Sequence, residues 1–362
     1  MRSPIIQPEQ IERVVVRGVN WVGDAVMTVP ALRELRRVLP HTHITLATRS
    51  WAEGLFADAD FVDDLLIYDR RPRDFRVIVR QAREWRSRRF DLALLFQNAF
   101  EAAFIAAAAR VRVRMGYATD GRSALLTNAI LLPRWRDERH EVFYYLNIVA
   151  ELEKLLYGAS RILEHEPQLA LNISEARKTQ AREFLTSQGV RMNRSLVALC
   201  PGSTNSRAKR WPAERYAALA DRFIAETGAN VLLIGSPDEH EVSREVEARM
   251  NHHPIMLTGR TDLAQAIAVL SLADVLITND TGPAHISAAL NRPTLVIFGP
   301  TDPRTTRPFS TVAEIVHHPP ECAPCMLRDC PIDHRCMTAI SPEEVFSRAS
   351  AMIKKEVAEV QT

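Results

Sequence analysis

The stretch VLITNDTGPAH (Val275–His285), with ISAALNRPTLVIFGP (286–300) after it, carries the clearest fold signal in this chain of 362 residues. Residues 275–278 are apolar and largely β-branched, which is typical of a buried strand in a parallel sheet. Residues 279–282 have the composition of a turn, and Pro283 suits the first turn of a helix. A second strand is predicted over 294–298. The order strand, turn, helix, strand predicts a βαβ unit, whose helix start can hold an anion, above all a diphosphate.

Several residue types in this turn suit contacts with a ligand. Asp280 suits ribose or sugar hydroxyls, and Gly282 lets the backbone approach a ligand closely. His285 adds a proton-bearing group in the first helical turn. An ordinary crossover has the same composition, so the stretch by itself leaves both interpretations open.

The rest of the chain repeats the alternation of strand and helix. Strands are predicted over 14–16, 44–47, 63–68 and 92–96, and again over 196–199, 231–234 and 255–257, with helices between them. Residues 164–174 are polar and lack periodicity, which makes them the best candidate for a linker. The sequence therefore predicts an α/β protein of two Rossmann-like, doubly wound domains with a ligand cleft between them.

Composition indicates a soluble globular protein. Hydrophobic residues make up 46% and charged residues 25%, and the net charge of +2 argues neither for nor against nucleic acid. The first 16 residues lack the apolar core of a signal peptide, and the longest apolar run, 102–109, is far shorter than the roughly 18 residues of a membrane span. We expect a cytoplasmic protein, in which the five cysteines are reduced.

One predicted helix, over 72–89, is strongly basic. Nine arginines lie between Arg70 and Arg89, while Phe75, Ile78 and Trp85 fall on one side. Such a helix can lie against an anionic membrane surface. It can equally be a solvated helix whose apolar side packs on the sheet.

A second glycine-containing loop follows the first predicted strand. The sequence RGVNWVGD (17–24) leads into a helix predicted over 25–39, which places Asp24 at the cap position. Aspartate is common at that position for structural reasons, so capping is the simplest interpretation of Asp24 taken alone.

Three motifs together resemble a known family. NWVGD (20–24), KRWP (209–212) and NDTGPAH (279–285), in this order and separation, resemble those of bacterial ADP-heptose:lipopolysaccharide heptosyltransferases, which form glycosyltransferase family 9. The resemblance spans about 14–350, and the cysteine-containing tail is more similar to heptosyltransferases of type II than to those of type I. It implies a GT-B fold with an acceptor-binding domain over 1–172, an ADP-heptose-binding domain over 173–340, and a final helix (341–362) that packs back toward the N-terminal domain.

The resemblance also implies an activity. It is the inverting transfer of L-glycero-D-manno-heptose from ADP-heptose to a heptosyl-Kdo2-lipid A acceptor, in lipopolysaccharide inner-core biosynthesis. Transfer to another core position (type I or III), and a nucleotide-sugar hydrolase or epimerase on the same fold, are the alternatives. A sensor that binds nucleotide sugar at the membrane without turnover is disfavoured by the intact Asp24 and Lys209. We expect no nucleic-acid partner, and peripheral contact with the cytoplasmic face of the inner membrane.

Carried over to this sequence, the resemblance implies roles for particular residues. Asp24 is the base that takes the proton of the attacking acceptor hydroxyl. Lys209 contacts the diphosphate of the leaving group, and these donors make a divalent metal unnecessary. Glu239 binds the ribose and Asp280 the donor sugar, while the backbone at 257–258 brackets the adenine. The remaining predicted substrate contacts are Gly23, Ser203, Thr204, Arg207, Thr281, Gly282 and His285.

Two further groups have weaker assignments. Arg114, Arg122, Arg134 and Arg136 are candidates for the acceptor site because they are basic and lie in the N-terminal half. The cysteines Cys322, Cys325, Cys330 and Cys336 have the spacing C-x2-C-x4-C-x5-C, and four thiolates this close can hold a structural zinc ion. Reduced structural thiols and labile disulfides are the alternatives, and no catalytic part is assigned to the group.

Overall fold

The computed structural model describes residues 7–68 and 75–360, with the side chains of 356–360 left out. The chain forms two compact units, Met1–Leu169 and Ala170–Thr362, each of which is described by itself. The predicted domain boundary, between 172 and 173, falls just after this division. The first three residues of the basic helix predicted over 72–89 lie outside the described residues.

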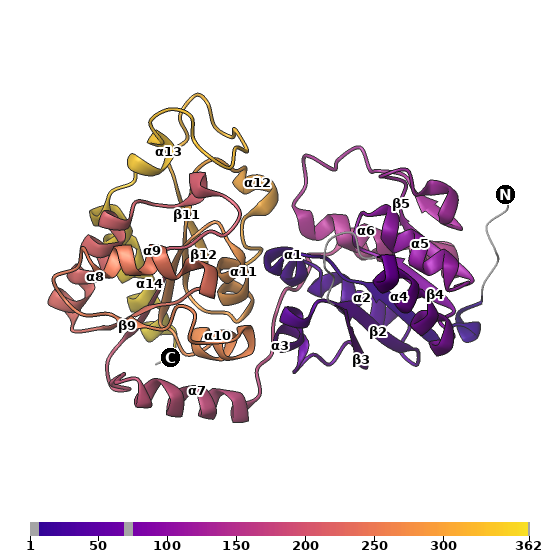
Figure 1. The fold of residues 1–362 in the computed structure, drawn as a ribbon, viewed down its shortest axis with the longest axis horizontal. Helices are drawn as coiled ribbons and strands as arrows, with labels where there is room; N and C mark the ends of the chain where they lie inside the picture. The colour runs from indigo at the N-terminus through magenta and orange to yellow at the C-terminus, as the bar shows by residue number, and fades with distance from the viewer. Residues whose placement is uncertain (1–6, 69–74, 361–362) are drawn as a thin grey trace. The chain divides into compact units, whose positions relative to one another are not determined.

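The N-terminal unit is built on a parallel sheet of six strands, counted among the described residues, in the order β3-β2-β1-β4-β5-β6 (Figure 1). The bounds are β1 Arg13–Arg17, β2 His43–Thr48, β3 Asp64–Ile67, β4 Leu92–Leu95, β5 Val113–Tyr117 and β6 Asn128–Ile130. Residues 14–17 of β1 and all of β4 are buried, which explains the apolar run 14–16 in β1 and the wholly apolar sequence of β4.

Helices cover both faces of this sheet. Helix α4 (Phe75–Arg88) packs against α5 (Phe100–Ala108), and their apolar residues form one core with Val15, Ala93 and Leu95. Helix α2 (Val29–Val38) packs against α6 (Glu141–Tyr157). Strands β1 to β3 are added toward one edge of the sheet, and β4 to β6 toward the other edge. Because each crossover is right-handed, this change of direction places α4 and α5 on the face opposite α2. The remaining helices of the unit are α1 (Val22–Met27) and α3 (Glu53–Phe56).

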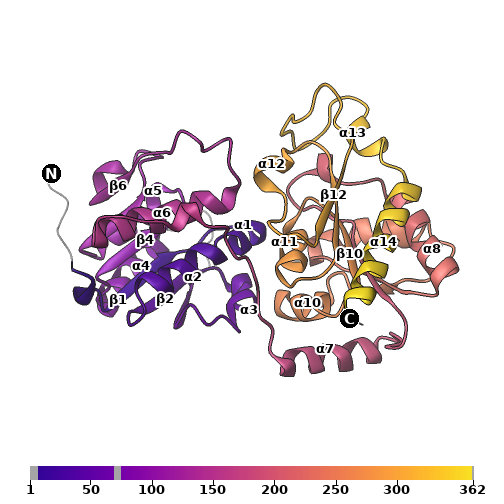
Figure 2. The ribbon, with the colours of Figure 1, turned by 180° about the vertical axis from the view of Figure 1, so that it is seen from behind.

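The C-terminal unit repeats the architecture, with strand order β12-β11-β10-β7-β8-β9. The bounds are β7 Leu196–Cys200, β8 Asn230–Leu233, β9 Ile255–Met256, β10 Val275–Asn279, β11 Thr294–Phe298 and β12 Ala313–His317. On one face α10 (Leu263–Leu270) lies beside both α7 (Glu175–Ser187) and α11 (Gly282–Ala289). Helix α8 (Ala213–Thr227) contacts both α9 (His240–Glu247) and α14 (Pro342–Val360), and Figure 2 shows α8 and α14 side by side.

The final helix belongs to the core of the C-terminal unit. Phe346 of α14 packs on Phe223 of α8, with ring centroids 4.7 Å apart, and Arg222 lies over the Phe346 ring. Its described contacts are within its own unit, and the expectation that it packs back toward the N-terminal domain stays a prediction.

Some elements differ from those predicted. Strands β5, β6 and β12 were not predicted, because Arg114 and Gly116 interrupt the apolar pattern of β5, and the other two are edge strands with mixed burial. Gly116 is needed there, since an added Cβ would lie 3.1 Å from the Cβ of Leu95. The helix predicted over 25–39 is two helices that meet at Thr28. Pro30, which has no N–H to donate to the preceding turn, accounts for the break.

No helix among the described residues combines the length and the apolar character needed to cross a bilayer.

Candidate functional site

Asp24 follows β1, at the carboxyl end of the N-terminal sheet. The N-cap of α1 is Trp21, so Asp24 is the third residue of the helix and not its cap, which corrects the simplest sequence interpretation. Its side chain is half-buried. A negative charge in the first helical turn is favoured by the helix dipole.

The surroundings of Asp24 include a phenol and a second carboxyl group on α6. Burial, and after it the charge of Asp24, raises the pKa of the Tyr145 phenol well above its ordinary value. Burial also raises the pKa of Glu141, although Arg136 forms an ion pair with it at 2.8 Å. The charges of Asp24 and Glu141 both raise the pKa of Tyr145, so both carboxyl groups lie near this buried phenol. Sequence reasoning missed Tyr145 and Glu141, which belong to no recognised motif.

A buried arginine ends β1 and was also missed. Arg17 is only 3% exposed, and its guanidinium donates to Gln97 Oε1 at 3.1 Å and to Gln81 Oε1 at 2.8 Å. The same group lies 3.5 Å from the centre of the Tyr68 ring and 3.9 Å from a Glu101 carboxylate oxygen. A charged residue at the end of an apolar strand is the sequence signal that could have identified it.

Two of the four candidate acceptor arginines hold the backbone of their own unit. Arg122 is fully buried and donates to the carbonyl of Tyr117 (2.9 Å), the carbonyl of Gln97 and the Asn98 side chain (2.7 Å). Arg114 donates to the carbonyls of Leu125 and Val111 at 2.7 and 2.6 Å. Their assignment to the acceptor is therefore corrected: these guanidinium groups stabilise the loop between β5 and β6.

The other two candidates remain accessible. Arg134 is exposed, and Arg136 is half-exposed, stacked 4.2 Å from the centre of the Tyr144 ring and paired with Glu141. Tyr144 itself accepts a hydrogen bond from Asn98, which follows β4. Polar side chains from the ends of β1 and β4 and from the start of α6 thus gather at the carboxyl edge of this sheet.

In the C-terminal unit Lys209 and Asp280 form an ion pair. Lys209 Nζ donates to Asp280 Oδ2 at 2.7 Å and to the Asp280 carbonyl at 3.2 Å, and Thr301 Oγ1 donates to the same carboxylate oxygen at 2.7 Å. The Asp280 side chain is 5% exposed, whereas that of Lys209 is 26% exposed. The cation is thus fixed by a buried anion and keeps one side open to a ligand. Thr301 was not predicted.

Asn279, the last residue of β10, connects the loops around this pair. It is fully buried, and its Nδ2 donates to the carbonyls of Pro201 and Gly202 at 2.8 and 3.1 Å. Its Oδ1 accepts from the Trp211 backbone N–H and from the Tyr216 hydroxyl at 3.0 and 3.1 Å. Sequence analysis treated Asn279 as a turn residue, while the structure shows that it joins the NDTGPAH and KRWP motifs to the loop that follows β7.

Glu239 lies against the loop that follows β7. Its Oε2 accepts from the Ser236 N–H and hydroxyl at 2.8 and 2.9 Å, and the residue is 8% exposed. An added Cβ at Gly202 would lie 2.3 Å from the Glu239 carboxyl, so a larger residue there would displace the Glu239 side chain. Glu239 is thus held in place beside the loop that carries Ser203.

The start of α11 lies directly after Asp280. Thr281 is the N-cap, Gly282 and Pro283 open the helix, and His285 is buried in its first turn. The N-cap residue makes no capping hydrogen bond through its side chain. The Ala284 N–H donates to the Thr281 carbonyl at 3.1 Å, but no cap side chain covers the helix start, and an uncovered helix start favours an anion. In the loop after β7, Ser203 is buried and Thr204 exposed.

A cysteine-containing loop supports the segment with Lys209. The Ala208 N–H donates to the Arg328 carbonyl at 2.9 Å, and His334 Nε2 donates to the Ala208 carbonyl at 2.6 Å. Arg207 pairs with Asp329 at 2.6 Å, and both side chains are mostly exposed. Residues 328–334 thus hydrogen-bond both the N–H and the carbonyl of Ala208, which precedes Lys209.

The four clustered cysteines line one small cavity of about 70 Å³, together with Ala208 and His334. All are free thiols, and burial raises the pKa of Cys336. Within the described ranges, no group of three or more His, Cys, Asp or Glu side chains has an arrangement that could hold a metal ion. The zinc site suggested by the spacing is not supported, because the thiols border a cavity without converging on one point. Cys200 is buried in β7.

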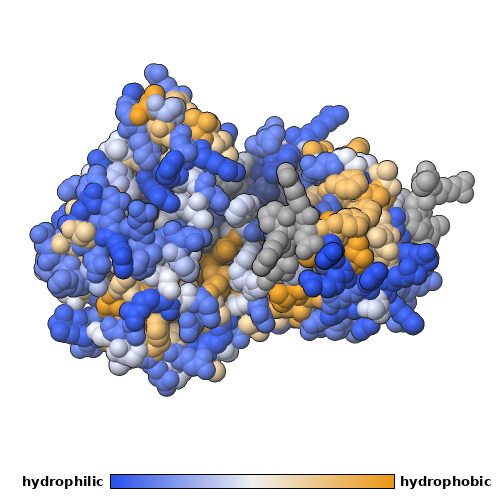
Figure 3. Space-filling model, viewed as in Figure 1, coloured by the Kyte–Doolittle hydropathy of each residue, from blue (hydrophilic) through white to orange (hydrophobic). Residues whose placement is uncertain are grey.

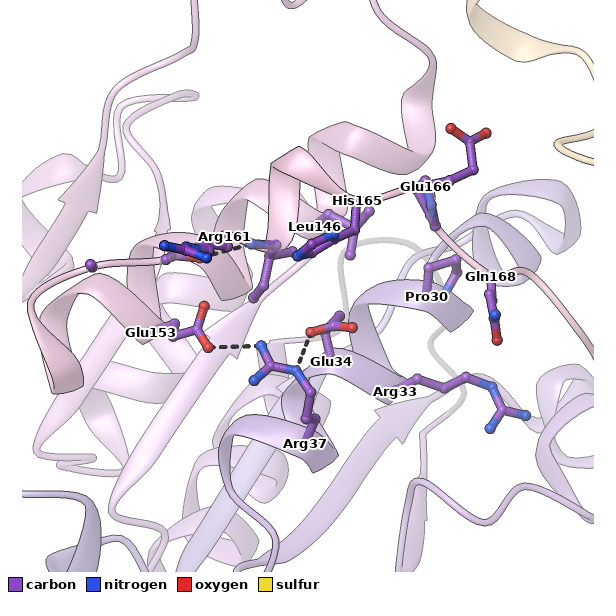
Figure 4. A pocket seen from close by; sticks show the side chains of 14 residues that line it. Pro30, Arg33, Glu34, Arg37, Leu146, Glu153, Arg161, His165, Glu166 and Gln168 are labelled. Atoms are coloured by element: carbon purple, nitrogen blue, oxygen red, sulfur yellow. Dashed lines mark hydrogen bonds and ion pairs between the residues drawn. The ribbon is translucent and has the colours of Figure 1, made fainter.

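A cavity of about 650 Å³ lies in the N-terminal unit between α2, α6 and residues 159–168 (Figure 4). Arg37 points into it from α2 and is bound to Glu34 and, at 2.7 Å, to Glu153 of α6. Its lining contains none of the predicted site residues. The charged groups of the cavity largely satisfy one another, so they indicate no particular ligand.

Two Rossmann-like units in one chain are the architecture of the GT-B fold. Residues 78–335 match glycosyltransferase family 9 (heptosyltransferase). The chain belongs to this family.

Relatives and solved structures agree over nearly the whole length. The chain is 30% identical to lipopolysaccharide heptosyltransferase 2 of Salmonella typhimurium over 325 residues, which cover 84% of this chain and 87% of that protein. The structure of ADP-heptose lps heptosyltransferase II from E. coli superposes with a TM-score of 0.81 at 26% identity, covering 95% of this chain and 99% of that one. E. coli heptosyltransferase WaaC with ADP, 18% identical with a TM-score of 0.68, covers 94% of this chain and 99% of that one and shares the fold.

Proposed function

We propose that this glycosyltransferase moves L-glycero-D-manno-heptose, with inversion, from ADP-heptose to heptosyl-Kdo2-lipid A during synthesis of the lipopolysaccharide inner core. The observation that carries the proposal is the Lys209–Asp280 pair at the start of α11. The second position of transfer is favoured because several relatives that match most of the chain are named heptosyltransferase 2.

The donor half of the proposal rests on charge. The leaving ADP gains negative charge on its diphosphate as the glycosidic bond breaks, and preorganised donors stabilise that charge. Lys209 supplies a cation held at fixed geometry, and the α11 start supplies backbone N–H groups beside it. The hydroxyls of Ser203 and Thr204, on the loop that Asn279 holds, are further donors. These groups perform the stabilisation that a divalent metal performs in other transferases, so we propose a metal-independent reaction.

The remaining donor contacts follow from the same loops. Glu239, fixed by Ser236, accepts hydrogen bonds from the ribose hydroxyls, and the backbone at 257–258 brackets the adenine. Asp280 both fixes Lys209 and offers its carboxylate to the heptose. Arg207 is a weaker phosphate ligand than Lys209 in this proposal, because Asp329 already neutralises it.

The acceptor half rests on Asp24. Inversion in a single displacement needs one base, which takes the hydroxyl proton as the acceptor oxygen attacks the anomeric carbon. Asp24 is a half-buried carboxylate in a first helical turn at the carboxyl edge of the sheet. That hydroxyl becomes acidic only late in the displacement, so an ordinary ionised carboxylate is sufficient. Gly23 leaves room beside it for the sugar.

The test is product formation with purified components. ADP-heptose, the protein and a heptose-deficient core acceptor should yield ADP and an acceptor heavier by one heptose in a mass spectrum. Release of ADP in the absence of acceptor would instead indicate a hydrolase. Binding of ADP-heptose with no release under either condition would contradict catalysis altogether.

An acceptor linked to lipid A is held in a membrane, so the enzyme that modifies it must work at the surface of that membrane. We propose that the protein works at the cytoplasmic face of the inner membrane, in peripheral contact with it.

A further inference from the structure

Helix α5 has an unusual outward side. Its buried residues are Ala102, Ala103, Ile105, Ala106 and the following Ala109. Five positions of α5 are not buried, and four of them, Phe100, Phe104, Ala107 and Ala108, are apolar and follow the spacing of one helical stripe. The fifth, Glu101, lies 3.9 Å from the buried guanidinium of Arg17 and is 18% exposed. Phe100 is 52% exposed, and its ring stacks on that of Phe104 with centroids 6.4 Å apart. A surface helix normally carries polar residues on this side, so the outward side of α5 needs a partner.

The neighbouring helix α4 has the opposite character. Its buried residues Gln81, Ala82 and Trp85 anchor it to the sheet. Arg76, Arg80, Arg83 and Arg86 project on the other side, and all four are exposed. Their spacing of four, three and three residues makes one cationic stripe along the helix.

These two stripes lie side by side on one face of the N-terminal unit. Helix α4 packs against α5, and both cover the same side of the sheet. Figure 3 shows a hydrophobic area over α5 next to strongly hydrophilic surface over α4. We call this surface, formed by the four arginines and the four outward residues of α5, the α4–α5 face.

We propose that the α4–α5 face binds the surface of an anionic phospholipid bilayer, with the arginines on the lipid phosphates and Phe100 and Phe104 among the acyl chains near the headgroups. Arginine stripes are attracted to anionic lipid, and exposed aromatic rings beside them enter the interface. A nucleic acid would use the arginines and leave the apolar stripe of α5 in water. A bilayer uses both stripes at once, which is why the juxtaposition favours lipid.

The inference deepens the proposed function, on which it rests for the reason to be at a membrane: the acceptor is itself anchored in the bilayer by lipid A. A transferase held at the interface meets this acceptor by diffusion in two dimensions. The sequence alone allowed two interpretations of the basic helix: contact with a membrane, or a solvated surface helix. The apolar outward side of α5, which only the fold places beside α4, favours contact with a membrane.

The first experiment measures binding to vesicles by co-sedimentation of the full chain. The probes are phosphatidylcholine vesicles with and without phosphatidylglycerol, at low and high salt. The wild type should bind the anionic vesicles, and binding should weaken with salt. The Arg80/Arg83/Arg86→Glu variant should lose at least about tenfold in affinity. The Phe100/Phe104→Ser variant should bind less well while keeping its salt dependence, because only the apolar part is removed.

The matched control reverses three exposed arginines of the other unit, as Arg191/Arg194/Arg244→Glu, which makes the same change in net charge. It should bind vesicles nearly as the wild type does. Equal losses in both triple variants would overturn the inference, because the effect would then come from total charge. So would wild-type binding by the Arg80/Arg83/Arg86→Glu variant, or a preference for duplex DNA over anionic vesicles. Circular dichroism and thermal melting confirm that each variant is folded.

Activity separates this inference from the proposed function. With a delipidated, water-soluble acceptor, the Arg80/Arg83/Arg86→Glu variant should transfer heptose at the wild-type rate. With the same acceptor embedded in anionic vesicles it should be slower, mainly through a higher apparent KM. A wild type that binds vesicles but transfers nothing overturns the proposed function and leaves the lipid-binding face standing. Equal rates for variant and wild type on embedded acceptor overturn the inference alone.

Discussion

The role proposed for Asp24 depends on a single carboxylate. Asp24→Asn keeps the shape and the hydrogen-bonding edge of the side chain but removes the base. We expect ADP-heptose affinity to stay close to that of the wild type, while kcat falls about 100- to 10,000-fold. Isothermal titration and a coupled ADP assay measure the two effects separately. An unchanged kcat would remove Asp24 from the mechanism.

A different result is expected for Lys209, since we propose that it binds the diphosphate of the leaving group in both the ground state and the transition state. Lys209→Ala should weaken ADP binding by roughly 10- to 100-fold, the usual loss for a charge-assisted hydrogen bond. It also leaves the buried carboxylate of Asp280 without its cation, which destabilises the fold. The Lys209→Ala/Asp280→Asn double variant removes that complication and should show the same loss of affinity. Arg207→Ala, an exposed neighbour already paired with Asp329, is the matched control and should bind ADP much more tightly than Lys209→Ala.

Glu141 gives a prediction about pH. Burial raises the pKa of its carboxyl in the folded protein, so folding disfavours the ionised form. The contribution of protonated Glu141 to the free energy of unfolding is complete below the pKa of the unfolded state, about 4.3. This contribution is lost as the pH rises through the higher pKa of the folded state. Glu141→Gln cannot ionise, so its Tm should rise relative to the wild type as pH increases from about 4 to neutrality. The exposed Glu138→Gln variant supplies the baseline, and a Tm difference independent of pH would contradict the argument.

In the loops of the C-terminal unit, the substitution Gly202→Ala, which adds one methyl group, tests the close approach of Gly202 and Glu239. An added Cβ at residue 202 lies 2.3 Å from the Glu239 carboxyl, which is the far end of a flexible side chain. Gly202→Ala should therefore displace Glu239 and leave the backbone and the Tm nearly unchanged. Nucleotide affinity should fall as much as in Glu239→Ala. In the double variant the alanine at 202 should have no additional effect, and an additive loss would show that the two residues act separately.

The buried Asn279 predicts a loss of stability. Asn279→Ala removes four hydrogen bonds and leaves the Trp211 N–H and the Pro201 carbonyl without their partner. Each buried group left unsatisfied costs about 1–3 kcal/mol, so the free energy of unfolding should fall by roughly 2–5 kcal/mol. Urea denaturation followed by tryptophan fluorescence measures this loss. Thr278→Val, one residue earlier in the same strand, gives a reference in which the loops around Asn279 keep their contacts.

These elements show what the sequence could and could not predict. The mostly apolar runs within β1, β4, β10 and β11 indicated a parallel sheet, because a strand buried on both faces is limited mainly to apolar residues. Strand β5 was missed because Arg114 faces the carbonyls of its own loop, a contact that only the tertiary fold creates. Short motifs likewise located Lys209 and Asp280, but they could not show that the two residues pair or that Thr301 completes the pair.

The same limit applies to the arginines. Composition treats Arg17, Arg80 and Arg122 alike, whereas the fold buries the first and last among carbonyl and amide oxygens and exposes the second. Whether a guanidinium is structural depends on hydrogen-bond partners that lie 64 and 80 residues away for Arg17, and on loop carbonyls for Arg122. The place of Arg17 at the end of an apolar strand is a local signal, but no local pattern in the sequence identifies these partners.

At the level of the whole chain, the donor site belongs to one compact unit. Lys209, Glu239, Asp280 and the start of α11 all lie within 170–362, which has its own sheet and its own core, closed by α14. A fragment of residues 170–362 should therefore fold alone and bind ADP with an affinity close to that of the full chain. It should transfer no heptose, because Asp24 lies in the other unit. Titration calorimetry with the fragment, with its Lys209→Ala variant as the control, makes the measurement. If the fragment is folded by circular dichroism but does not bind ADP, the N-terminal unit must contribute to the nucleotide site. That result would contradict the assignment of donor binding to the C-terminal unit alone.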